Sequence, residues 1–141
     1  MKTSFKNSFY YYSNLSLGGA CVLFASGIFA IIFSSLESLY VVTSLTLFAL
    51  GFVTSLKAFA ISITRSRHEI ITTSHLIVLP KQTETRIKVG LYGSLLVQIT
   101  VSITFAATQS STNFAFGILA SVFALGNLNM WAILNGTFHK R

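Results

Sequence analysis

The chain has 141 residues, of which 52% are hydrophobic and 9% are charged, and its mean hydropathy is +0.70. Soluble domains carry about 25% charged residues, so this chain could not cover its surface with polar groups. The composition excludes a soluble globular domain and predicts one domain, residues 1–141, whose surface mostly faces lipid.

Four apolar runs follow one another along the chain, at residues 15–33, 39–63, 89–107 and 114–134. Each has the roughly 20 residues that a helix needs to cross a hydrocarbon core of about 30 Å. A membrane β-barrel would need alternating segments of about 10 residues, whereas these runs are apolar on both faces. The sequence therefore predicts an all-α fold, an integral membrane four-helix bundle.

The first run follows Lys2 and Lys6 and resembles a signal peptide. Its 19 residues exceed the 7–15 of a cleaved apolar region, and no A-x-A site closes it. We therefore expect an uncleaved first helix. The aromatic side chains expected at the membrane–water interfaces are Phe5, Phe9, Tyr10, Tyr11, Tyr12, Tyr92 and Trp131 on one side and Tyr40 on the other.

The basic residues all fall on one side of the predicted membrane. The short connections 34–38 and 108–113 contain none of the ten, which are Lys2, Lys6, Lys57, Arg65, Arg67, Lys81, Arg86, Lys88, Lys140 and Arg141. Lys57 lies inside the second run, but its stem can reach the headgroups. The positive-inside rule then places both termini and the 64–88 link in the cytoplasm, with short hairpins outside. Dual topology would need a nearly balanced charge.

The net charge of +7 also suggests nucleic-acid binding. The topology and the attraction to anionic lipid already account for the same charges, and no nucleic-acid-binding motif accompanies them. We expect the lipid bilayer as the partner and no nucleic acid.

The link at residues 64–88 is too short to form a core of its own. Its stretch 69–79 is rich in Ile, Thr and Val, which indicates a strand or a segment lying on the membrane. His68, Glu69 and His75 have irregular spacing and do not form a metal-binding pattern. We expect no metal and no cofactor.

Small residues recur at helical spacing in each run, which predicts one packing face per helix because close backbone contact drives helix association in lipid. The four stripes are Gly18, Cys21 and Ala25; Gly51, Ser55, Ala58 and Ser62; Gly90, Ser94, Gln98 and Ser102; and Asn113, Gly117, Ala120, Ala124, Asn127 and Trp131.

Three amides fall within the predicted spans: Gln98, Asn127 and Asn129. An amide exposed to lipid there would cost several kcal/mol. We expect Gln98 and Asn127 to bond to each other or to backbone across the helix interface; a polar substrate or ion site is the alternative. The candidate contact residues are Gln98, Asn127, Asn129, Gly117, Gly51 and Ser55.

The sequence lacks the residue patterns that are typical of enzymes and of proton-coupled pumps. The three acids Glu37, Glu69 and Glu84 lie outside the runs, whereas a proton-coupled pump needs an ionisable group at membrane depth. Small four-helix multidrug exporters carry a glutamate in their first helix, and residues 15–33 have none. Cys21 is the single cysteine, and no Gly-rich phosphate loop, Ser/His/Asp set or HExxH motif occurs. We expect a non-enzyme.

The last third of the chain combines Gln98, the sequence FAFG at residues 114–117, Trp131, and Gly136–Thr137–Phe138 followed by Lys140 and Arg141. This pattern resembles the C-terminal helix pair of small four-helix membrane proteins of actinobacteria, over residues 88–141. The chain departs from them in being rich in Ser, Phe, Ile and Lys where they are rich in Ala and Arg, often with prolines in the tail. These proteins have no established activity, so the resemblance implies location and architecture only.

Together these features predict a multi-pass protein of the bacterial inner membrane. The leading hypothesis is a non-enzymatic accessory or structural component that acts with a membrane-protein partner or with further copies of itself. A small oligomeric channel or transporter is the alternative. A water-filled space lined by Gln98 and Asn127 would favour the channel, and a filled centre would favour the first hypothesis.

Overall fold

The computed structural model describes residues 2–71, 77–79, 83–109, 112–136 and 138. Helices account for 86% of these residues, and none of them lies in a β-strand. The helices are α1 (Lys2–Ile32), a 3₁₀ turn η1 (Ser34–Leu36), α2 (Glu37–Arg65), α3 (Thr85–Thr108), α4 (Thr112–Ala115), α5 (Gly117–Ala120) and α6 (Val122–Asn135). The all-α prediction is confirmed.

Four helical segments are long and apolar enough to cross a membrane, which is the number of long apolar helices that the sequence predicts. They are Ser8–Ile32, Ser34–Arg65, Thr85–Thr108 and Asn113–Asn135. The first helix begins well before residue 15, where the apolar run begins. An apolar run indicates only the part of a helix that suits lipid, and a helix can extend beyond it. α1 extends into the polar segment before residue 15, where Phe9 and Ser13 still lie on its buried face.

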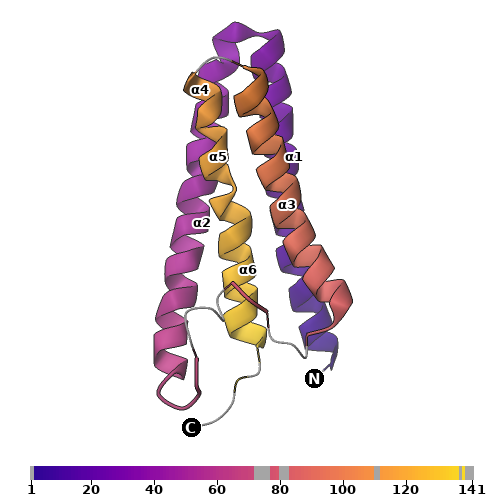
Figure 1. Cartoon of the computed structure of the whole chain (residues 1–141), viewed down its shortest axis with the longest axis vertical. Coiled ribbons are helices and arrows are strands. Elements are labelled where there is room, and N and C mark those ends of the chain that lie inside the picture. The colour runs from indigo at the N-terminus through magenta and orange to yellow at the C-terminus, as the bar shows by residue number, and fades with distance from the viewer. Residues whose placement is uncertain (1, 72–76, 80–82, 110–111, 137, 139–141) are drawn as a thin grey trace.

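The four segments form one elongated bundle (Figure 1). α1 and α2 form a hairpin, α3 packs on α1, and α4, α5 and α6 follow one another along α2. α6 contacts α1, α2 and α3, and so it lies at the centre of the bundle although it is the last helix. α2 and α6 run in the same direction.

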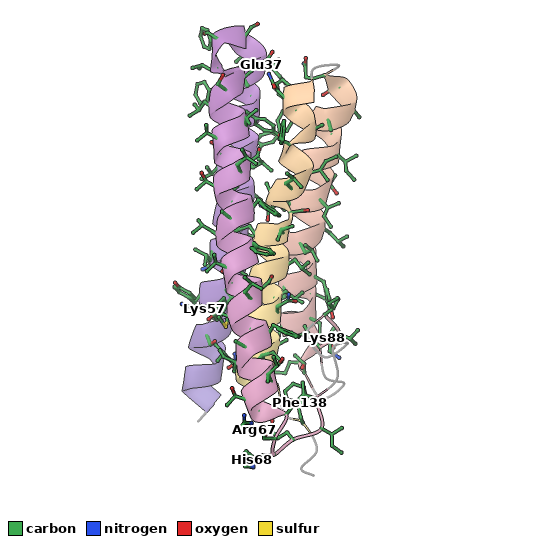
Figure 2. All side chains as sticks on the ribbon, turned by 90° about the vertical axis from the view of Figure 1, so that its left-hand side faces the viewer. Glu37, Lys57, Arg67, His68, Lys88 and Phe138 are labelled. Carbon is green, nitrogen blue, oxygen red and sulfur yellow. The ribbon has the colours of Figure 1, made fainter. Side chains whose placement is uncertain are left out.

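Cationic side chains of the described residues gather towards one end of the bundle (Figure 2). Arg67, His68 and Lys88 lie towards one end, and Glu37 lies at the other. We call the first the basic end; there α1 begins, α2 ends, α3 begins and α6 ends. A hydrogen bond from Asn135 Nδ2 to Ser8 Oγ, 3.2 Å long, joins the end of α6 to α1.

The fourth segment is interrupted twice, at Phe116 and at Ser121. The backbone there makes hydrogen bonds between residues three apart, as in a 3₁₀ helix, instead of four apart as in an α-helix. They run from Leu119 N to Phe116 O at 3.1 Å and from Ser121 N to Ile118 O at 3.3 Å. The run at residues 114–134 predicted one continuous helix, because an apolar pattern carries no signal for a change in hydrogen-bond spacing. Both interruptions occur beside residues that pack tightly against other helices, as described below.

The predicted packing faces of the last three spans are largely those that the structure buries. Gly90 and Ser55 are half-buried and Asn113 is exposed, whereas the other members are buried: Gly51, Ala58, Ser62, Ser94, Gln98, Ser102, Gly117, Ala120, Ala124, Asn127 and Trp131.

The predicted face of α1 is wrong. Gly18, Cys21 and Ala25 are all exposed, and a Cβ placed on Gly18 would have nothing within 4 Å. The helix buries instead a second line of small residues, around Gly19 and Gly27. A Cβ on Gly19 would lie 2.6 Å from the Phe123 ring, and one on Gly27 would lie 2.5 Å from the Phe105 ring. The sequence contained two such lines, and only the rings of other helices distinguish them.

The two larger of the three apolar clusters among the described residues lie on either side of the middle of the bundle. One contains Leu23, Tyr40, Leu47, Phe105, Phe114, Ala120 and Phe123, and the other, towards the basic end, contains Phe9, Leu79, Ile87, Leu91, Leu128, Trp131 and Ala132. Tyr40 and Trp131 are completely buried, so they do not face lipid headgroups as the aromatic pattern predicted. Gln98 and Asn127 lie between the clusters along their helices.

Candidate functional site

Gln98 is the polar side chain at the middle of the bundle. It is completely buried, with 0% of its surface exposed, and its Nε2 donates a 3.0 Å hydrogen bond to the carbonyl oxygen of Ala120. Ala120 ends α5, directly before the interruption at Ser121. A carbonyl at a break in a helix needs a donor in place of the regular helical one. Gln98 of α3 therefore stabilises the interruption of the fourth segment.

The oxygen of the Gln98 side-chain amide, unlike its nitrogen, makes no hydrogen bond to the described residues. Gln98 Oε1 is buried and has no hydrogen-bond partner among the described residues. An unpaired buried acceptor costs about 1–3 kcal/mol. The backbone oxygen of Gln98, in contrast, accepts a 2.8 Å bond from Ser102 Oγ.

Asn127 bonds to a different helix. Its side chain is 2% exposed, and its Nδ2 donates to Ser16 Oγ of α1 at 3.1 Å. The expectation that Gln98 and Asn127 bond directly to each other is therefore wrong. Gln98 faces Ala120, which precedes Asn127 by seven residues or about 10 Å of helix. Gln98 instead bonds to backbone across the interface, which was the other expectation.

Asn129 is the third amide and faces α2. Its Nδ2 lies 3.4 Å from Ser55 Oγ, and 8% of the residue is exposed. The fourth segment thus makes polar contacts with all three of the other long helices, through Ser16, Ser55 and Gln98. These contacts fix its register against each neighbour.

Glycines bring the backbones of α2 and α6 into direct contact. A Cβ on Gly51 would overlap the backbone of Val122 and Phe123, and a Cβ on Gly126 would lie 3.0 Å from Gly51 Cα and overlap the Gly51 oxygen. Gly51 was a predicted contact residue; Gly126 was not, because its partner lies on a helix remote in sequence. Such contacts replace the hydrophobic drive that lipid cannot supply.

Gly117, the first residue of α5, leaves room for the ring of Tyr40. A Cβ at Gly117 would lie 2.8 Å from Tyr40 Cζ and would overlap the hydroxyl oxygen. Tyr40 is 0% exposed, and its hydroxyl has no hydrogen-bond partner among the described residues. The first interruption, at Phe116, lies beside this close approach.

Arg65 closes the basic end of α6. Its guanidinium donates to the carbonyl oxygens of Ile133 and Gly136, the latter at 3.3 Å, and forms a 2.7 Å ion pair with Glu69. It also lies 5.2 Å from the centre of the Phe138 ring. The last carbonyls of a helix lack internal partners and favour a cation. This role of Arg65 could not be predicted from the sequence, since only the fold brings α2 and α6 together.

The chemistry of the interior is that of neutral polar groups. The polar side chains that meet near the middle are neutral, such as those of Gln98, Asn127 and Ser16, while Glu69 is paired with Arg65 near the basic end. His75 of the histidine-containing link lies outside the described residues. Because Gln98 is 0% exposed and Asn127 is 2% exposed, there is no room for a water molecule against Gln98 and almost none against Asn127. Among the described residues, the side chains of Gln98 and Asn127 serve to hold the helices together.

The chain matches no protein-family model, no curated protein and no solved structure. The resemblance of residues 88–141 to the actinobacterial membrane proteins therefore stays a prediction. The function has to be inferred from the bundle itself.

Proposed function

We propose that this chain is a multi-pass protein of the bacterial inner membrane and serves there as a non-enzymatic accessory or structural component. Large apolar side chains on the outside of the bundle support the membrane location. Those more than half exposed include Val22, Phe29, Ile32, Val42, Leu50, Val53, Leu56, Val89, Leu96 and Ile103. They would form far more apolar surface than a soluble protein exposes, and lipid is the solvent that suits them.

The proposed orientation has the basic end in the cytoplasm. The described cations Arg65, Arg67, Arg86 and Lys88 belong to this end, which the positive-inside rule assigns to the cytoplasm. The residues 34–38 and 108–113 would then face the periplasm.

Alkaline phosphatase folds actively only outside the cytoplasm, so fusions to it test this orientation. Fusions within residues 34–38 or 108–113 are expected to be active, and fusions within residues 64–88 inactive, when equal amounts of each are compared. Green fluorescent protein fused at the same positions should give the opposite pattern. An active phosphatase in the 64–88 link would contradict the orientation.

The filled middle of the bundle is the observation that carries the structural role. The side-chain nitrogens of Gln98 and Asn127 each donate a hydrogen bond to another helix, and neither described side chain borders a space for water or substrate. A transporter commonly places ionisable groups in such a position, whereas this interior has neutral groups that fix the register of packed helices. A protein built in this way provides a rigid apolar surface for other membrane components.

The interrupted fourth segment favours the second candidate, a small channel or transporter formed by several copies. Broken helices are frequent at the binding sites of transporters, and Gln98 Oε1, next to one of the breaks, is a buried acceptor that has no partner within the described part of the chain. In this candidate the bundle opens beside Ala120, and Gln98 meets the transported ion or solute.

Flux measurements distinguish the two candidates. The purified chain, reconstituted into vesicles of phosphatidylethanolamine and phosphatidylglycerol, is expected to carry no K⁺, Na⁺, Cl⁻ or proton flux above that of empty vesicles. After mild detergent extraction of native membranes, the chain should migrate on a native gel above the size of its purified form. A flux that Gln98→Leu abolishes, with the variant still folded, would support the channel instead.

A further inference from the structure

A short piece of the link between α2 and α3 returns to the side of the bundle. Residues 77–79 cross α6 near its end (Figure 1). Leu79 is 4% exposed and belongs to the apolar cluster of the basic end, together with Leu91 of α3 and Trp131 of α6. The piece is therefore packed onto the bundle by its last side chain.

One phenol holds the backbone of this piece. The hydroxyl of Tyr92 in α3 donates a 2.8 Å hydrogen bond to the carbonyl oxygen of Ile77 and accepts a 3.1 Å bond from the N–H of Leu79. In water these two groups would need no protein partner. In hydrocarbon each unpaired backbone group costs several kcal/mol, so non-helical backbone is tolerated there only when protein groups satisfy it.

The side chains of Ile77 and Val78 face outward. They are 53% and 59% exposed, respectively, although both are apolar and β-branched. Ile70, in the same link, is 51% exposed. An inward Leu79 between outward apolar neighbours leaves an apolar surface on the outside of the piece.

The height of Tyr92 places this surface at the edge of the membrane. Tyr92 follows Thr85, the first residue of α3, by seven residues, about 10 Å along the helix. The apolar segment Thr85–Thr108 would be about 36 Å long, only some 6 Å more than a hydrocarbon core of about 30 Å. Helical side chains lean towards the N-terminus, so the phenol reaches back from Tyr92 to the hydrocarbon boundary, where tyrosine is enriched.

We propose that residues 77–79 form a re-entrant strap whose Ile77 and Val78 side chains insert into the bilayer at the boundary between headgroups and acyl chains. The strap rests on the proposed membrane location of the bundle. The occupant of its outer surface is lipid, because Tyr92 satisfies the backbone as a hydrocarbon environment requires and because the cations Arg67 and Arg86 of the same end of the bundle suit an anionic leaflet.

Fluorescence quenching tests the strap with three single-cysteine variants in a Cys21→Ala background. Val78→Cys reports on the strap, Val53→Cys on the exposed face of α2 within its span, and His68→Cys on the exposed end of the link. Each is labelled with bimane and reconstituted into phosphatidylethanolamine and phosphatidylglycerol vesicles, where lipids carrying a shallow nitroxide quench from within the bilayer and iodide quenches from water.

The label at Val78 is expected to be quenched by nitroxide and protected from iodide, like the label at Val53, whereas the label at His68 should show the reverse. A Val78 label that iodide reaches as freely as the His68 label would overturn the strap. A Val78 label protected from both quenchers would also overturn it, because a protein surface would then cover the position. A Val53 label open to iodide would contradict the membrane location itself, so the two failures are distinguishable.

Tyr92→Phe removes only the hydroxyl that holds Ile77 and Leu79. In this background the Val78 label is expected to lose its protection from iodide. Tyr11→Phe is the control: it removes an exposed hydroxyl from the part of α1 nearer the basic end and should leave the Val78 label protected from iodide. If Tyr92→Phe also leaves it protected, the phenol does not hold the strap at the membrane and the proposal fails.

Discussion

Gly126→Ala is expected to weaken the bundle more than any other single-methyl addition to α6. The new Cβ would overlap the backbone of Gly51, which cannot rotate away as a flexible side chain can. Overpacking of this kind costs about 1–3 kcal/mol, and α2 and α6 would have to separate along their length. The free energy of unfolding, measured by titration with sodium dodecyl sulfate in mixed micelles, should fall by an amount in that range.

Two other glycines provide matched controls for this substitution. Gly18 and Gly93 have nothing within 4 Å of an added Cβ, so alanine there adds the same methyl group without a collision. Alanine is the better helix former, by about 1 kcal/mol in water, and both variants should be as stable as the parent or slightly more so. Equal losses at Gly18 and Gly126 would contradict the direct contact between α2 and α6.

A set of double-mutant cycles is expected to separate the partners of the buried amides. Asn127→Leu should cost about 1–2 kcal/mol, because it leaves the Ser16 hydroxyl without its partner. Ser16→Ala should cost less in the presence of Asn127→Leu than alone, with a coupling energy of about 0.6–1.7 kcal/mol. The same titration in mixed micelles measures all four proteins of the cycle.

Gln98→Leu is the comparison for that cycle. It removes the donor to Ala120 O and shares no hydrogen-bond partner with Asn127, so the costs of Gln98→Leu and Asn127→Leu should add to within about 0.5 kcal/mol. A coupling energy between them above about 1 kcal/mol would mean that the two amides bond directly.

The positions of the spans could be predicted from the sequence because apolar length is a local property. The faces could be predicted only where a helix carries a single line of small residues. α3 follows its line through Ser94, Gln98 and Ser102, whereas α1 has two lines, and the choice between Gly18 and Gly19 depends on the ring of Phe123, more than 100 residues away. Facing residues on different helices are invisible to periodicity.

The same limit applies to the candidate site. That Gln98 and Asn127 would be buried and bonded follows from the cost of an amide in lipid, but their partners depend on the register between helices. A shift of two turns decides between Asn127 and Ala120 as the neighbour of Gln98. The role of Arg65 could not be predicted for the same reason, since only the folded bundle brings its guanidinium near the carbonyl oxygens of Ile133 and Gly136.

The central position of α6 has a consequence for the order of assembly. Membrane helices enter the bilayer in the order of their synthesis, so α1, α2 and α3 would meet lipid before the helix that binds all three has left the ribosome. During that interval Ser16, Ser55 and Gln98 would lack the partners that they have in the finished bundle. The three-helix intermediate would be the form of the chain most exposed to quality-control proteases and most in need of a membrane chaperone.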